Sequence, residues 1–186
     1  MESIRAFVAV ELPDEARAIL YEDTKNFLSQ INGVIKRVDM NQLHITLFFF
    51  EHIQKDKLAE IKEQLDRLDM KSFKITLKGF NTFDDKNLRI IFADIENAEY
   101  INKIYNYLLP TALKLDADIK KFYKPHITLA RIKYIDYNNK NKLLSMIKEK
   151  QMFEFGSFNC NAIKIIESIL KNDKPEYIDL YKKNLI

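Results

Sequence analysis

Apolar side chains recur along this chain in two periods that alternate with each other. Runs rich in β-branched, aliphatic and aromatic residues are typical of buried strands, whereas apolar residues three or four positions apart are typical of amphipathic helices. The first half accordingly predicts strands over residues 4–12, 43–50 and 73–80 and helices over residues 14–31 and 55–68. Pro13 ends the first strand, Asp14 is placed to cap the first helix, and Gly33 is placed to stop it.

The same order of elements returns in the second half. Strands are predicted over residues 88–95 and 126–132, with helices over residues 98–115 and 138–150. Further strands are predicted over residues 153–158, 162–170 and 177–180, with a turn over residues 171–175. The chain therefore predicts an α+β fold in which one pattern is used twice.

Two pairs of matching segments give the size of this repeat. Arg5-x-x-x-Ala9 aligns with Arg89-x-x-x-Ala93 at an offset of 84, and the tetrapeptide His-Ile-Thr-Leu at residue 44 returns at residue 126, an offset of 82. Two copies are too few for a solenoid, so the pattern indicates an internal duplication. No Pro-, Ser- or Gly-rich linker separates the halves. We therefore expect residues 1–186 to form a single bilobal domain.

Composition and charge exclude several classes of protein. The chain is 47% hydrophobic and 31% charged, and its net charge of +3 attracts polyanions only weakly. A single cysteine, Cys160, excludes an internal disulfide and a multi-cysteine zinc site, and it fits a reducing compartment. With only three glycines the chain has neither a Walker loop nor a dinucleotide fingerprint, because both need clustered glycines.

The apolar stretch near the N-terminus does not predict a signal peptide. It spans only residues 7–10 and is followed directly by Glu11 and Pro13. No apolar run approaches the roughly 20 residues that a bilayer crossing needs. We therefore expect a cytoplasmic protein with no membrane partner.

The histidines carry the most informative pattern. His44 and His126 each open the tetrapeptide His-Ile-Thr-Leu, and only His52 lies outside it. Side chains at i and i+2 of a strand share a face, so each histidine shares a face with a threonine, Thr46 or Thr128, while the Ile and Leu are buried behind. If the halves pack about a pseudo-twofold axis, two histidines and two threonines meet in one cleft.

Such a cleft suits acid–base chemistry at an anionic group. The imidazole pKa of about 6.5 lets one ring accept a proton while the other donates one, and threonine hydroxyls donate hydrogen bonds without adding charge. Arg131 falls on the opposite face of an ideal strand from His126, but a bulge or strand end would turn it back toward an anion. These groups suit in-line displacement at phosphorus without a metal.

At this point the residues resemble a known family. The two His-x-Thr-x motifs, the opening IRAFVAVELP, the segment KPHITLAR and the closing ILKNDKPEY look like the 2H phosphoesterase superfamily, and most like its RNA 2′,3′-cyclic phosphodiesterases, also called 2′-5′ RNA ligases. The resemblance implies a bilobal pseudo-twofold fold, with two antiparallel sheets lining a central cleft and helices outside. It also implies hydrolysis of RNA 2′,3′-cyclic phosphate ends to 2′-phosphomonoesters, with neither cofactor nor metal.

The resemblance also implies a role for each residue of the cleft. His44 looks like the general acid that protonates the departing 3′-oxygen, and His126 looks like the general base that activates water. Thr46 and Thr128 match the phosphate-holding threonines, and Arg131 matches the basic residue after the second motif. The two histidines are nearly symmetric by motif, so their roles depend on the resemblance alone. The implied partner is RNA with a 2′,3′-cyclic phosphate end, tRNA fragments included, and we expect a monomer.

One stretch departs from the family pattern. After the first motif the family often reads Lys-Phe-Leu-Gly-Glu, whereas residues 48–52 read Phe-Phe-Phe-Glu-His. Phe48 falls on the alternating face of His44 and Thr46, so it is a candidate for stacking on a base. The alternative is that Phe48 is buried, because aromatic runs usually belong to a core.

Other interpretations stay open. The same chemistry fits hydrolysis of small cyclic nucleotides or 2′-5′ oligoadenylates, and the reverse reaction would be ATP-independent 2′-5′ RNA ligation. A non-catalytic module that binds RNA ends is a different class, and a metal hydrolase using both histidines is a third, although no His-Glu-x-x-His cluster is present. Three lysines are candidates for an RNA-backbone patch, with a solvated surface as the equal alternative: Lys120, Lys121 and Lys124.

Overall fold

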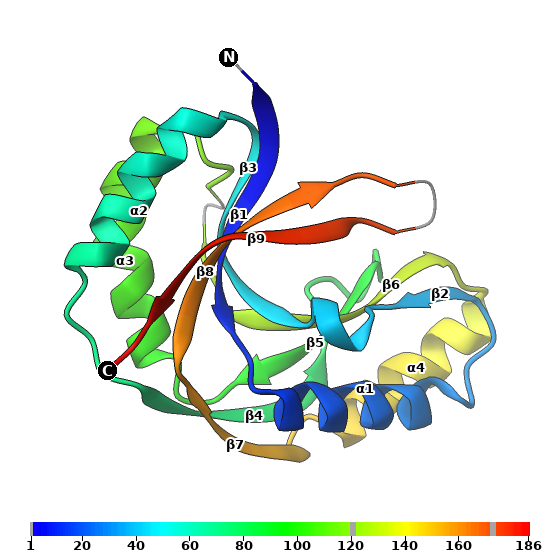
Figure 1. Ribbon diagram of the computed structural model, residues 1–186. Coiled ribbons are helices and arrows are strands. Elements are labelled where there is room, and N and C mark those ends of the chain that lie inside the picture. Colours follow the sequence, from blue (N-terminus) through cyan, green and yellow to red (C-terminus); the bar gives the residue numbers. More distant parts are fainter. Residues whose placement is uncertain (1, 120–121, 172–173) are drawn as a thin grey trace.

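The α+β architecture predicted from the sequence is confirmed by the computed structural model, which describes residues 2–119, 122–171 and 174–186 (Figure 1). The strands of this part of the chain are β1 (Ser3–Glu11), β2 (Val34–Arg37), β3 (His44–Gln54), β4 (Phe73–Asn81), β5 (Ile90–Ile95), β6 (His126–Tyr134), β7 (Glu154–Cys160), β8 (Ala162–Ile169) and β9 (Glu176–Asn184). The helices are α1 (Asp14–Leu28), α2 (Leu58–Arg67), α3 (Glu99–Lys114) and α4 (Tyr137–Glu149), with 3₁₀ turns at Met40–Gln42 and Lys55–Lys57. None of these helices combines the length and the apolarity that a bilayer crossing requires.

All nine strands belong to one antiparallel sheet. Its order is β7-β4-β5-β6-β3-β1-β8-β9, and β2 pairs with the part of β6 that lies beyond the pairing with β3. The two predicted sheets are thus two lobes of a continuous sheet. Among the described residues, the lobes are joined through β3 and β6 at one pair, Ile45 and Ile127. The two strands that carry the histidine motifs therefore meet at the middle of the molecule.

Helices are exchanged between the lobes. Helix α1 follows β1 but packs against β6 and β7, whereas α3 follows β5 but packs against β3 and α2. In Figure 1, α2 and α3 cover one lobe while α1 and α4 cover the other. One apolar cluster consequently runs through both lobes. We propose that residues 1–186 form one domain. The exchange of helices supports this proposal, because each lobe of the sheet is covered by a helix that follows a strand of the other lobe.

The first helix begins at residue 14 as predicted, but its predicted cap and its predicted end are wrong. Asp14 is not the cap, since the helix begins at Asp14 after Pro13, and no side chain caps it. Asp14 instead pairs with Arg17 within the first turn. The helix ends at Leu28, five residues before Gly33, because Ser29 donates its backbone and hydroxyl hydrogens to the carbonyl of Asn26 and closes the last turn there. The short strand β2 follows, and the sequence did not predict it.

Gly79 generates a stability prediction. It lies in β4 with φ at +68°, at a register shift between Lys78 and Phe80, and a Cβ there would overlap the carbonyl oxygen of Gln151. Gly79→Ala should lower the free energy of unfolding by at least about 1–2 kcal/mol, the cost of the left-handed conformation alone. Urea unfolding followed by circular dichroism measures it. Asn141→Ala, on the exposed side of α4, should leave the midpoint unchanged or raise it. Equal midpoints for Gly79→Ala and the unchanged protein would contradict the prediction.

Candidate active site

The strands β3 and β6 are bulged at the same place in their motifs. In β3, residues 46 and 48 lie opposite consecutive residues of β1, so Leu47 between them is additional. In β6, Leu129 is additional in the same way, opposite a register shift in β5. An additional residue reverses the alternation of the side chains beyond it. Residues five positions after each histidine therefore return to the face of that histidine.

The two bulges determine where Arg131 and Phe48 point, and only the prediction for Arg131 agrees with the structure. Arg131 returns to the face of His126 and Thr128 and lines the same cavity, as the bulge hypothesis required. The prediction that Phe48 shares the face of His44 is wrong, because the bulge turns it into the core. Phe48 is 1% exposed there and stacks on Tyr105 with ring centroids 4.6 Å apart. Phe49 lines the cavity in its place.

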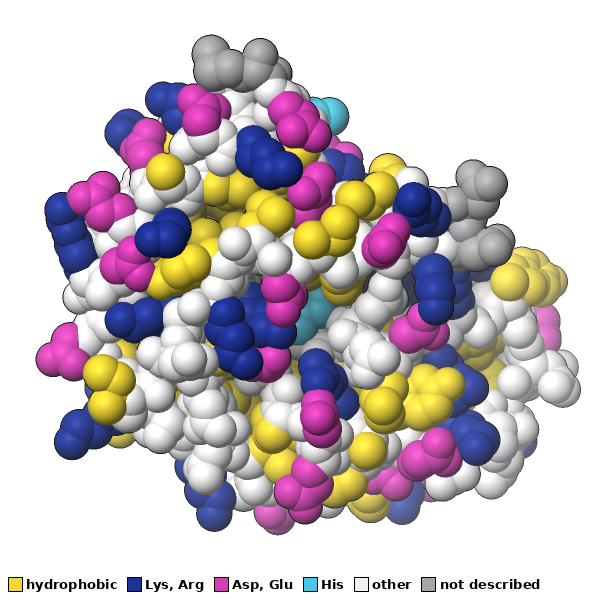
Figure 2. Space-filling view, viewed as in Figure 1, with side chains coloured by type: hydrophobic (Ala, Val, Ile, Leu, Met, Phe, Trp, Pro, Cys, Tyr) yellow, Lys and Arg dark blue, Asp and Glu magenta, His cyan; other side chains and the backbone are white. Residues whose placement is uncertain are grey.

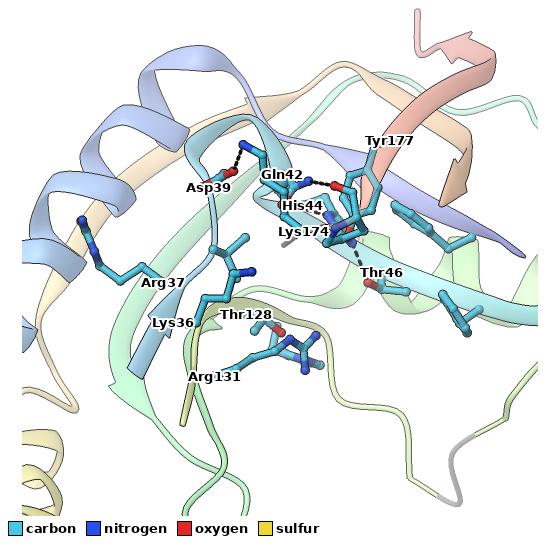
Figure 3. Close-up of a pocket in the computed structure, with 15 residues that line it drawn as sticks. Lys36, Arg37, Asp39, Gln42, His44, Thr46, Thr128, Arg131, Lys174 and Tyr177 are labelled. Carbon is cyan, nitrogen blue, oxygen red and sulfur yellow. Dashed lines mark hydrogen bonds and ion pairs between the residues drawn. The ribbon is translucent and has the colours of Figure 1, made fainter. Parts of the chain in front are cut away.

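The two motifs line a common cavity of about 270 Å³ between the lobes. All five residues predicted for phosphate chemistry are on its wall: His44, Thr46, His126, Thr128 and Arg131. Figure 3 labels His44, Thr46, Thr128 and Arg131 there. The other lining residues come from β1, from the segment that contains β2 and the first 3₁₀ turn, from β3, and from the start of β9: Phe7, Lys36, Arg37, Val38, Asp39, Gln42, Phe49, Lys174, Pro175 and Tyr177. Figure 2 shows a histidine at the bottom of a hollow in this face, with Lys and Arg side chains beside it.

The register of the central pair sets how the motifs face each other. Because Ile45 pairs with Ile127 in an antiparallel arrangement, position 44 lies across from position 128, and position 46 lies across from position 126. The isoleucines of this pair are fully buried behind the cavity. Each histidine thus has a threonine two positions along its own strand and another across the junction.

Both imidazoles are held in the same tautomer by the backbone. His44 Nδ1 lies 2.6 Å from the carbonyl oxygen of Gln42, and His126 Nδ1 lies 2.7 Å from that of Lys124. A carbonyl oxygen only accepts, so Nδ1 carries the hydrogen in both rings and Nε2 is the reactive nitrogen. His44 Nε2 lies 3.0 Å from Thr46 Oγ1, whereas His126 Nε2 has no hydrogen-bond partner among the described residues.

Burial keeps both histidines neutral in the free protein. Removal from water lowers the pKa of His44 to about 4, and the positive charge of Arg131 acts in the same direction. Burial also lowers the pKa of His126, the charge of Lys124 lowers it further, and Asp94 opposes both effects. An anion bound between the rings would raise both pKa values, because it stabilises imidazolium.

The remaining charges around the cavity are mostly positive. Lys36 of β2 lies directly opposite Arg131 of β6. Arg37, next to it, extends toward α1, where its guanidinium lies 4.8 Å from the ring centroid of Tyr21 (Figure 3). The sequence pattern did not indicate Lys36 and Arg37, because a four-residue strand is too short to show a period. Lys174 pairs with Asp39 at 2.7 Å, and Gln42 donates to the carbonyl of Pro175 at 2.5 Å, so the start of β9 is tied to the turn before His44.

Other candidate groups are not part of this cavity. Cys160 is buried, and burial raises its pKa to about 12, so it stays a thiol at neutral pH. Lys120 and Lys121 lie outside the described residues, and Lys124 pairs with Asp94 at 2.7 Å. In the part of the chain that the structure describes, His, Cys, Asp and Glu side chains form no group of three or more that suits a metal ion.

The pKa values give a direct test of this geometry. Ring proton signals of His44 should titrate near pH 4 and those of His126 below 6.5, because burial disfavours the charged form. Inorganic phosphate should move both midpoints upward. At pH 7, long-range ¹H–¹⁵N spectra should show both rings protonated at Nδ1. A His44 midpoint at or above about 6.5, the ordinary value, would contradict the burial of this ring in solution.

Comparison with known proteins agrees with the earlier resemblance. Residues 7–182 match the family described as the AKAP7 2′5′ RNA ligase-like domain. The RNA 2′,3′-cyclic phosphodiesterase of Archaeoglobus fulgidus is 30% identical over 181 residues, which cover 95% of this chain and 98% of that relative. The RNA 2′,3′-cyclic phosphodiesterase of Methanocaldococcus jannaschii is 31% identical over 175 residues, which cover 94% of this chain and 96% of that relative.

Solved structures show the same fold. The crystal structure of TT0787 of Thermus thermophilus superposes with a TM-score of 0.80 at 28% identity, over 98% of both chains. E. coli LigT complexed with 3′-AMP superposes with a TM-score of 0.76 over 99% of both chains, and its 19% identity makes this a likeness of fold alone.

Proposed function

Since this chain belongs to the 2′5′ RNA ligase-like family, within the 2H phosphoesterases, we propose that it hydrolyses 2′,3′-cyclic phosphates at RNA ends to 2′-phosphomonoesters. The observation that carries the proposal is the cavity itself, whose wall combines two half-buried imidazoles of one tautomer with two threonines and an arginine. The substrate class is supported by the curated relatives, which are named RNA 2′,3′-cyclic phosphodiesterases.

The reaction is an in-line displacement at phosphorus. Thr46, Thr128 and Arg131 hold the non-bridging oxygens of the cyclic phosphate by hydrogen bonds and charge. A water molecule attacks phosphorus from the side opposite the 3′-oxygen, the new P–O bond forms, and the bond from phosphorus to the 3′-oxygen breaks. The phosphate stays attached to the 2′-oxygen. His126 Nε2 accepts the proton of the water, and His44 Nε2 donates a proton to the departing 3′-oxygen.

The pKa values are compatible with these roles once substrate is bound. His44 has to be protonated to act as the acid, although its pKa in the free protein is about 4. The bound phosphate offsets the charge of Arg131 and stabilises imidazolium, so it raises the pKa of His44 in the complex. After each turnover His126 carries the proton and His44 lacks one, and exchange with solvent restores the starting state.

The proposal extends to the finer features of the reaction. A 5′-hydroxyl in place of water would give ATP-independent 2′-5′ ligation in the same cavity, which we place second because water is the commoner nucleophile. The protein acts as a monomer without a metal or other cofactor, and tRNA fragments are among its RNA substrates.

Removal of either histidine tests the catalytic pair. His44→Ala and His126→Ala should each lower turnover of an oligoribonucleotide ending in a 2′,3′-cyclic phosphate by at least about 100-fold, because each removes a proton-transfer group. The assay contains EDTA, and the product is identified as a 2′- or 3′-monoester. His52→Ala is the matched control, since His52 is exposed and outside the cavity.

Four outcomes would count against the proposal. A rate equal to that of the unchanged protein in either variant would remove that histidine from the reaction, and a 3′-monoester would mean that the 2′-oxygen departs instead. Loss of activity in EDTA would contradict the metal-free mechanism. Salt-sensitive RNA binding with no product at any pH would leave a binding module.

A substrate with sulfur in place of the bridging 3′-oxygen separates the acid from the base. A thiolate departs without prior protonation, because thiols are far more acidic than alcohols. The sulfur substrate should therefore restore most of the rate that His44→Ala loses and should leave His126→Ala slow. Rates are compared as variant-to-unchanged ratios on the two substrates. Restoration of His126→Ala instead of His44→Ala would reverse the assigned roles.

A further inference from the structure

The two bulges that shape the cavity are held in different ways. In β6, the carbonyl of the additional residue, Leu129, accepts a hydrogen bond of 2.8 Å from the backbone of Val38, which directly follows β2. In β3, the pairing with β6 is limited to Ile45, and β1 is the only described strand that pairs with β3 at its bulge. Groups outside the strands therefore contribute to holding the β3 bulge.

The connection between α3 and β6 supplies two hydrogen bonds to this bulge. Tyr123 Oη donates to the carbonyl oxygen of Thr46 at 3.0 Å, directly before the additional residue Leu47. The backbone of Asp118 donates to the carbonyl oxygen of Phe49 at 2.8 Å, beyond the additional residue. The connection thus holds the bulge on both sides, and one of its two donors is a side chain that a substitution can change.

The ring of Tyr123 is held in place independently of its hydroxyl. It stacks on Tyr105 with centroids 3.9 Å apart and the planes 4° from parallel, and Tyr105 stacks in turn on Phe48, the residue that the bulge turns into the core. Burial raises the pKa of Tyr123 far above its ordinary value, so the hydroxyl keeps its hydrogen at neutral pH. Removal of the hydroxyl alone would leave this stack in place.

Hydrogen bonds lead from this short segment to both histidine motifs. Thr46, whose carbonyl accepts from Tyr123, has its Oγ1 3.0 Å from His44 Nε2. Lys124, the residue after Tyr123, orients the ring of His126 through its own carbonyl. The segment before β6 therefore contacts a residue of the first motif and orients the histidine of the second. It is a contact between the motifs in addition to the central strand pair.

We propose that Tyr123 is a positioning residue, whose hydroxyl fixes the Thr46 side chain for contact with a phosphate in the cavity through its hydrogen bond to the Thr46 carbonyl. It depends on the proposed function, because Thr46 is one of the groups that hold the cyclic phosphate there. Without the Tyr123 hydroxyl, the peptide before Leu47 gains freedom to rotate. That rotation turns Thr46 Oγ1 away from the phosphate, while the stacked rings keep the fold intact.

A double-mutant cycle tests whether Tyr123 acts through Thr46. Tyr123→Phe should lower kcat/KM on an oligoribonucleotide with a 2′,3′-cyclic phosphate end by about 3- to 12-fold, the fold-change that corresponds to one hydrogen bond. The same substitution should have no further effect in a Thr46→Val background, because the hydroxyl that it positions is absent. It should keep its full effect in a Thr128→Val background.

Tyr107→Phe is the matched control for these measurements. Tyr107 also donates its hydroxyl to a backbone carbonyl, that of Gln64 at 3.2 Å, but it does so outside the cavity. Its substitution should leave kcat/KM unchanged in every background. All rates are expressed per folded protein, with the folded fraction taken from urea unfolding. Equal losses from Tyr123→Phe in the Thr46→Val and Thr128→Val backgrounds would overturn the positioning role.

Phosphate binding separates this inference from the catalytic proposal. Titration of the His126 ring signals with inorganic phosphate should give a dissociation constant that Tyr123→Phe raises by about 3- to 12-fold, and that it leaves unchanged in the Thr46→Val background. This result without hydrolysis of any cyclic phosphate would reject the proposed function and keep the positioning role. Hydrolysis by the unchanged protein, with kcat/KM and phosphate affinity both unaltered in Tyr123→Phe, would reject the positioning role and keep the function.

Discussion

The antiparallel contact between β3 and β6 is the constraint on which the cavity depends. The pair Ile45 and Ile127 is the only residue pairing between these strands in the described chain, and both side chains are fully buried. Rotation of one lobe about this contact would separate His44 from Thr128 and Thr46 from His126. The rigidity of the site therefore depends on the packing around the junction. The exchanged helices provide that packing, because α1 and α3 each pack against the lobe opposite to the one that contains the preceding strand.

Binding of an anion in the cavity is coupled to protonation of the two imidazoles, those of His44 and His126. Burial that costs an imidazolium its hydration leaves both rings neutral in the free protein. An anion bound between the rings would supply the missing negative charge, so anion binding and proton uptake would favour each other. The backbone carbonyls of Gln42 and Lys124 keep Nε2 of each ring as the reactive atom in either state. The same backbone interaction therefore orients both rings.

The two halves repeat the same motif and the same bulge, but they present different side chains beyond the bulge. After equivalent bulges, β6 presents Arg131 and β3 presents Phe49.

The sequence alone determined the features that depend on residues close together along the chain. Alternation along HITL was enough to place His44 and Thr46 on one face with Ile45 behind them, and the helical and strand periods gave every helix and all strands except β2. What a side chain meets beyond its own strand was decided by the tertiary structure. Phe48 and Phe49 are chemically identical, and only the pairing of β3 with β1 decides which one is buried, because a bulge arises from the register of two strands. Tyr177 likewise comes from β9, far from both motifs along the chain, so only folding brings it beside His44.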